Sequence, residues 1–149
     1  MKEPAVTDST CLIGLERTGH LDILPALFEP VLIPPEVDKE FGISLPWLTI
    51  KAPINEKLVA ALKMLADDGE AEAIALTVEQ KCLIVLDDRQ ARFVAKHFVT
   101  SIIGTVGILL RAKRTGIIPS VRTVLGELEA NSFYISCSLK EAALHLAGE

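Results

Sequence analysis

The chain has 149 residues, half of them apolar, and a formal net charge of −5. This length predicts one domain over residues 1–149 that buries a core without disulfides or structural metal. The longest apolar stretch, residues 101–110, is shorter than the ~20 residues of a membrane helix, and residues 1–4 do not resemble a signal peptide, so we expect a soluble, cytoplasmic protein without membrane contacts.

The first half of the chain alternates short apolar segments with helical patterns. It predicts strands over residues 5–8, 31–33 and 47–50, and helices over residues 11–17, 21–28, 36–41 and 54–65. Ser9 and Thr10 are candidate caps of the first helix, and Gly19 follows its end. The Pro34-Pro35 pair opens the third helix, because proline is tolerated in a first turn.

The second half continues the alternation. It predicts strands over residues 83–86 and 100–103, and helices over residues 70–81, 88–97, 105–114, 119–131 and 136–147. Residues 83–86 are apolar without interruption, which is typical of a strand covered on both faces. Strand and helix alternate through most of the chain, so the predicted class is α/β with a mostly parallel sheet.

Acidic residues lie where predicted strands end or helices begin. They are Asp8, Glu36, Glu40, Glu70, Glu72, Asp87 and Asp88. Ligands of an open parallel sheet bind at the carboxyl ends of its strands. The helix after Glu70 and the strand before Asp87 have similar lengths, about 18 Å and about 16 Å, so both acids should lie at one edge. Asp8 ends its own strand and should lie on the same side.

Carboxylates crowded at one edge raise each other's pKa unless a cation lies between them. Oxygen ligands suit Mg²⁺ or Mn²⁺, whereas the three cysteines and three histidines lack the spacing of a zinc site. Taken alone, Glu70 stabilises a helix dipole, Asp88 is an N-cap and Glu36 fits a Pro-Pro-Glu helix start. Together the acids predict a site for a hard divalent cation.

The motifs around these acids resemble a known family. Residues 8–13, Asp-Ser-Thr-Cys-Leu-Ile, are similar to the opening motif of PIN-domain ribonucleases, and residues 31–41 resemble their second strand and acid-bearing helix. Residues 69–76, 86–92 and 103–113 resemble the DUF3368 branch, with its similarity to toxins. The resemblance extends from residue 6 to about residue 148.

The resemblance implies a three-layer α/β/α nuclease in which Mg²⁺ or Mn²⁺ activates water for attack on an RNA phosphodiester. By position, the four implied catalytic acids are Asp8, Glu40, Glu70 and Asp88. The implied metal ligands are Asp8, Glu70, Asp87 and Asp88, with Glu72 as a near alternative. Ser9 or Thr10 is expected to orient Asp8 or a water molecule.

Expected partners follow from charge and from kinship. Arg89, Arg92 and Lys96 recur along the helix after Asp88, where they would position RNA phosphates or form a solvated face. The resemblance implies a small antitoxin protein as a partner. Apolar late helices favour a homodimer.

Three functions remain open at this point. The first is a metal-dependent endoribonuclease that acts as the toxin of a toxin–antitoxin pair. The second is a catalytically weak PIN-like module that binds RNA or protein, since Glu70 stands where most PIN domains have Asp and the net charge is negative. The third is a phospho-receiver-like switch at Asp87 or Asp88, which lacks the expected lysine after a late strand.

Overall fold

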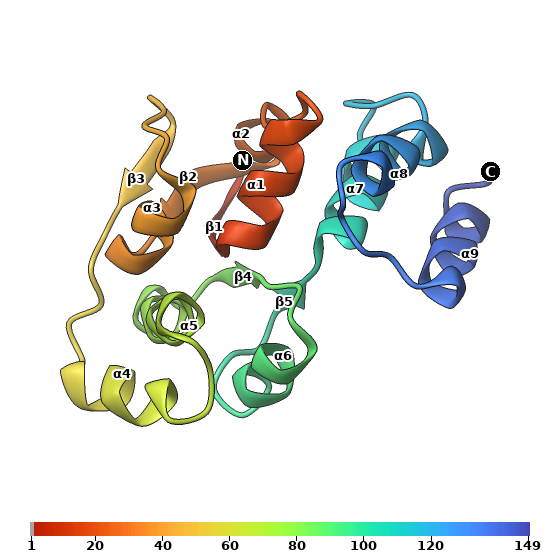
Figure 1. Ribbon diagram of the computed structural model, residues 1–149. Coiled ribbons are helices and arrows are strands. Elements are labelled where there is room, and N and C mark those ends of the chain that lie inside the picture. Colours follow the sequence, from red (N-terminus) through yellow and green to blue (C-terminus); the bar gives the residue numbers. More distant parts are fainter. Residues whose placement is uncertain (1) are drawn as a thin grey trace.

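A parallel sheet forms the centre of the computed structural model, which describes residues 2–149. Its five strands are β1 (Glu3–Thr7), β2 (Phe28–Ile33), β3 (Leu48–Ile50), β4 (Leu83–Val85) and β5 (Ile102–Ile103). All neighbouring strands are parallel, in the order β3-β2-β1-β4-β5 (Figure 1). The predicted α/β class and parallel sheet are confirmed.

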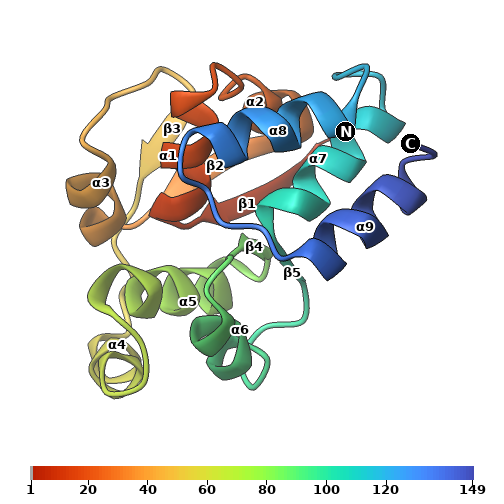
Figure 2. The same cartoon turned by 45° about the vertical axis from the view of Figure 1, so that its right-hand side comes forward.

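Each face of the sheet has its own core, because successive strand residues point to opposite sides. Ala5 and Val85 belong to one core, whereas Val6 and Ile84 belong to the other. The first core is covered by α1 (Ser9–Arg17), α2 (Ile23–Leu27), α7 (Thr105–Arg114) and α8 (Val121–Ala130), and the second by α4 (Glu56–Lys63), α5 (Asp68–Gln80) and α6 (Arg89–Ala95) (Figures 1 and 2). The fold is therefore a three-layer α/β/α sandwich.

Two helices begin at acidic caps that the sequence analysis did not assign. Asp8, and not Ser9 or Thr10, is the N-cap of α1: its side chain accepts a hydrogen bond from the Cys11 N–H. The α5 helix starts at Asp68, two residues before the expected start at Glu70, and Asp67 is its N-cap. Glu70 returns a bond to the Asp67 N–H, which completes a capping box. Both corrections place carboxylates at helix N-termini, where the dipole favours negative charge.

The boundary between α2 and β2 also differs from expectation. The predicted helix over residues 21–28 is shorter, and β2 begins at Phe28 rather than at Val31. Phe28 pairs with Glu3 of β1 and buries its ring in the core, so tertiary packing extends the strand. The α3 helix (Pro35–Phe41) opens at the proline pair, as predicted. None of the helices within residues 2–149 has the length and apolar character needed to cross a bilayer.

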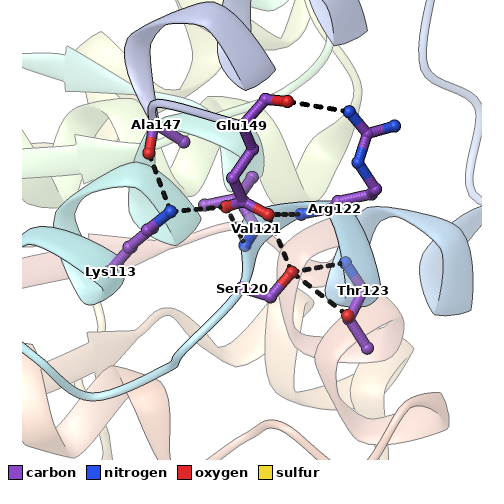
Figure 3. A network of polar contacts seen from close by, with 7 residues as sticks. All are labelled: Lys113, Ser120, Val121, Arg122, Thr123, Ala147 and Glu149. Carbon is purple, nitrogen blue, oxygen red and sulfur yellow. Dashed lines mark hydrogen bonds and ion pairs between the residues drawn. The ribbon is translucent and has the colours of Figure 1, made fainter.

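The last helix, α9 (Cys137–Leu146), is held by few apolar contacts and a polar cluster. Ala143 is its one buried residue. After the helix, the Glu149 carboxylate accepts hydrogen bonds from Lys113 Nζ, Ser120 Oγ and the Val121 N–H at 2.8, 2.8 and 2.7 Å (Figure 3). We call this cluster the Glu149 clasp. The hydrogen bond from Lys113 is the main reason that the pKa of Glu149 falls to about 2.

Candidate metal centre and its adjoining groove

The strand order reverses direction between β1 and β4. The chain moves from β1 towards β2 and β3 on one side, and β4 and β5 lie on the other side. The helix that follows β1 and the helix that precedes β4 cover opposite faces (Figure 1). Such a reversal opens a crevice at the carboxyl ends of the two strands. Asp8 directly follows β1, and Asp87 follows β4 after Leu86.

Asp8 is fixed between the two central strands. Its side chain is buried, and Oδ1 accepts a hydrogen bond from the Cys11 N–H at 2.9 Å. Oδ2 accepts a bond from the Asp87 N–H at 3.0 Å, while the N–H of Asp8 donates to the Val85 carbonyl at 3.0 Å. The carboxylate is therefore held by backbone donors from both sides of the crevice.

This environment disfavours the negative charge on Asp8. Burial is the largest effect, followed by the nearby charge of Asp87, and together they raise the pKa of Asp8 to about 8. The hydrogen bonds from Cys11 and Asp87 act in the opposite direction, and the charge of Glu70 raises the pKa further. A buried carboxylate with carboxylate neighbours is costly without a cation.

Thr105 positions Asp87. The N–H and Oγ1 of Thr105 donate to the two carboxylate oxygens of Asp87 at 2.9 and 2.6 Å. Burial raises the pKa of Asp87, whereas the two bonds from Thr105 and the charge of Arg92 lower it. Sequence reasoning missed Thr105. Its only signal was a threonine at the start of a predicted helix, and a hydrogen bond across 18 residues leaves no local pattern.

Glu70 and Asp88 come from the starts of two helices on the second face. Burial raises the pKa of Glu70 to about 7, and the charges of Asp67 and Asp88 add to the effect. Asp88 is exposed and caps α6 through the Ala91 N–H at 2.9 Å. The charge of Glu70 raises the pKa of Asp8, and the charge of Asp88 raises the pKa of Glu70, so Glu70 lies near both the buried pair and the exposed acid.

Glu40, on α3, lies against Ser9 and Gly69, which are sequence neighbours of Asp8 and Glu70. Its Oε2 accepts a hydrogen bond from Ser9 Oγ at 3.3 Å, so Ser9 orients Glu40 rather than Asp8. A Cβ atom at Gly69 would contact Glu40 Oε1, so a glycine at this position leaves the room that Glu40 occupies. Burial is the largest cause of the raised pKa of Glu40, followed by the charge of Asp67.

Glu72 and Glu36 lie at the junction of α3 and α5. Glu72 Oε1 accepts a hydrogen bond from the Glu36 N–H at 3.1 Å. The Glu36 carboxylate pairs with Lys39, also at 3.1 Å. The Glu72 carboxylate is thus bound to the N-terminal turn of α3.

The candidate metal ligands at the crevice are all carboxylate oxygens. Within residues 2–149, no three His, Cys, Asp or Glu side chains converge closely enough to hold an ion by themselves. Mg²⁺ is usually held by one or two carboxylates, several waters and substrate phosphates. Asp8 and Asp87, with raised pKa values that a nearby cation would lower, fit such an ion and not zinc, which prefers four nitrogen or sulfur ligands.

A groove of about 1080 Å³ leads away from the crevice. Asp87 and Asp88 line one part of it, together with Arg17, Arg89 and Arg92. Arg92 donates to the Leu86 carbonyl at 3.3 Å, which directs it towards the end of β4. Lys96 is exposed at the C-terminal end of α6 and is not part of the groove lining.

Comparison with known proteins places this geometry in a family. The DUF3368 family model, described as a PIN domain, matches residues 4–149. No curated protein and no solved structure matches the chain.

Proposed function

The chain belongs to the DUF3368 family of PIN domains, and from this membership we propose that it is a metal-dependent endoribonuclease that hydrolyses RNA phosphodiester bonds. PIN domains are generally nucleases. The observation that best supports the activity here is the buried Asp8, which accepts the Asp87 N–H at the point where the strand order reverses.

We assign the metal to Asp8 and Asp87, and we assign to Glu70 an electrostatic role beside this pair. When bound, Mg²⁺ or Mn²⁺ would lower the pKa of a water molecule and offset the charge that develops on the phosphate. Thr105 keeps Asp87 in place, and Cys11 keeps Asp8 in place. Both contacts organise the site before RNA binds.

Glu70 and Glu40 are proposed to act in proton transfer. The pKa of Glu70, about 7, suits a carboxylate that accepts a proton from water at neutral pH. Glu40, held by Ser9, is proposed as the second acid at the edge of the crevice. Arg89 and Arg92 are proposed to bind phosphates of the substrate, because both line the groove beside Asp88.

The biological setting of the proposal rests on kinship alone. We propose that the nuclease acts in the cytoplasm as the toxin of a toxin–antitoxin pair, inhibited by a small protein, and that it forms a homodimer. Co-expression with the product of a neighbouring gene would test the inhibitor.

The nuclease proposal is tested by Asp8→Asn. Asn keeps a side-chain oxygen for the cap of α1 but removes the charge, so cleavage of single-stranded RNA with Mn²⁺ should fall by about 10³-fold or more, the equivalent of several kcal/mol. Asp22→Asn is the matched control, because Asp22 is exposed and its side chain makes no capping bond. Equal cleavage by the wild type and the Asp8 variant would contradict the assignment.

A catalytically weak binding module is the second candidate. It is favoured by the finding that, in the described part of the chain, no three ligand side chains converge. Calorimetric titration with Mn²⁺ separates the two functions. Heat of binding that disappears in Asp8→Asn supports the nuclease, and no binding at millimolar Mn²⁺ supports the module.

A further inference from the structure

The groove extends beyond the acids and is large for a small-molecule site. It runs from Asp87 and Asp88 between α1 and α7 to the segment over residues 131–136 and to α9. Its volume of about 1080 Å³ lies just above the ~300–1,000 Å³ that is common for small ligands. A ligand made of several linked units can extend along this lining from Asp87 and Asp88 to α9.

The cations of the groove are available to an anionic ligand. Arg17, Arg89 and Arg92 come from α1 and α6 and line its walls. None of the three forms an ion pair with a carboxylate within residues 2–149. Asp87 and Asp88 line the same groove, and Arg92 lies near enough to Asp87 to lower its pKa, so Arg17 and Arg89 are the cations left for a ligand. Guanidinium groups match the geometry of phosphates.

An aromatic side chain stands at the far part of the groove. Tyr134 lines it and is 86 % exposed. The preceding residue, Phe133, is anchored on α1: a Cβ atom at Gly14 would come within 2.8 Å of the Phe133 ring. The segment is thus fixed by Phe133 and presents Tyr134 to solvent. An exposed ring in a groove that also holds arginines is suited to stack on a nucleobase.

We propose that this groove binds single-stranded RNA beside the cleaved bond, with phosphates on Arg17 and Arg89 and a base stacked on Tyr134. The inference rests on the proposed nuclease function and names the part of the substrate that the chain holds. A single strand is required because the bases of a duplex already stack on one another and offer no free face to Tyr134. Tyr134 is a positioning residue in this scheme.

The test measures binding without cleavage. The wild-type chain in chelator is titrated into a labelled single strand of about 12 nucleotides, within the range of known single-strand sites, and anisotropy is followed. We expect Tyr134→Ala to weaken binding about 10–100-fold, whereas Tyr134→Phe retains the ring and binds within about twofold of wild type. Met64→Ala is the surface control, since Met64 is 85 % exposed at the C-terminal end of α4 and does not line the groove.

An oligonucleotide without bases separates stacking from charge. It should remove the difference between wild type and Tyr134→Ala but keep the loss caused by Arg17→Ala. Unchanged binding by Tyr134→Ala, equal affinity for duplex RNA, or no binding of single strands would overturn the inference. If single strands bind through Tyr134 but are not cleaved with Mn²⁺, the groove assignment stands and the nuclease proposal fails. If RNA is cleaved equally well by wild type and Tyr134→Ala, the nuclease proposal stands and the groove assignment fails.

Discussion

At the scale of single residues, the site depends on close approaches as much as on the acids themselves. Glu40 occupies space that any side chain at Gly69 would need. Gly69 is buried in the first turn of α5 and has an ordinary helical setting, so alanine there would not strain the backbone. Its role is to let Glu40 approach the start of α5.

Gly69→Ala should therefore reduce activity without removing any acid. The added methyl group would displace the Glu40 carboxylate, and a misplacement of about 1 Å can cost up to about 10²-fold in rate. Cleavage rate and thermal unfolding are measured together, with Gly126→Ala as the control because a Cβ atom there meets nothing within 4 Å. An unchanged rate would contradict the need for the Glu40 carboxylate at this position.

The positions of Asp8 and Asp87 at strand ends could be predicted from the sequence, because each follows an apolar run typical of a strand in a parallel sheet. Their bonding partners were not predictable. Ser9 was expected to cap or to orient Asp8, yet it bonds to Glu40 from a different helix. Thr105 bonds to Asp87 only because β5 brings α7 beside β4. Contacts of this kind depend on tertiary packing and have no local signature.

At the scale of elements, alanine is expected to have opposite effects on stability at two helix glycines. Gly14 lies inside α1 under the Phe133 ring, whereas Gly126 is exposed inside α8. Alanine at Gly14 should destabilise the protein by about 1–2 kcal/mol, because overpacking outweighs the gain in helix propensity. Alanine at Gly126 should stabilise it by about 0.5–1 kcal/mol. Urea unfolding measures both, and equal signs would contradict the packing of Phe133 on α1.

The Glu149 clasp predicts a pH-dependent stability. The folded pKa of Glu149 is about 2, below its ordinary 4.5, so the clasp stabilises the fold above pH ~4.5 and loses its effect as the pH falls towards 2. The stability difference between wild type and Glu149→Gln should be largest above pH ~5 and vanish near pH 2. Glu129→Gln, which breaks the exposed pair with Lys140, is the control and should show a smaller difference. A difference that persists at pH 2 would contradict the charge of Glu149 as its cause.

Elements with strong periodicity were predictable and their junctions were not. The expected helix over residues 105–114 has the same bounds in the structure. The start of β2 was missed because an apolar residue such as Phe28 fits a helix and a strand equally well. Its pairing with Glu3 places it in the strand. Similarly, Asp67 looked like a turn residue until Glu70 completed the capping box.

At the scale of the whole molecule, carboxylate crowding predicts that a divalent ion stabilises the fold. Binding to the native state alone adds about 2.7 kcal/mol at a concentration of 100 Kd, or roughly 5–10 °C in Tm for a protein of this size. We expect Mn²⁺ to raise the Tm of the wild type by this order, and chelator to reverse the increase. Asp8→Asn should show little increase. A shift of the same size in both proteins would place the ion elsewhere.

The alternation of strands and helices was enough to predict the α/β class and the parallel sheet. The order β3-β2-β1-β4-β5 could not be obtained from the pattern. The strands β1 and β4 are apolar on both faces, so either could pair with several neighbouring strands. Only this order sets Asp8 beside Asp87. The lengths of the predicted elements placed Asp8 and Asp87 at one edge of the sheet, but they did not show that β1 and β4 are neighbours.

The reversed strand order also governs when the site can exist during synthesis. The N–H that fixes Oδ2 of Asp8 belongs to a residue 79 positions later in the chain. At about 5–20 residues per second, a ribosome needs several seconds to provide it. A nascent chain therefore carries its first carboxylate without the neighbour that orients it. The proposed metal centre therefore cannot form before Asp87 has left the exit tunnel.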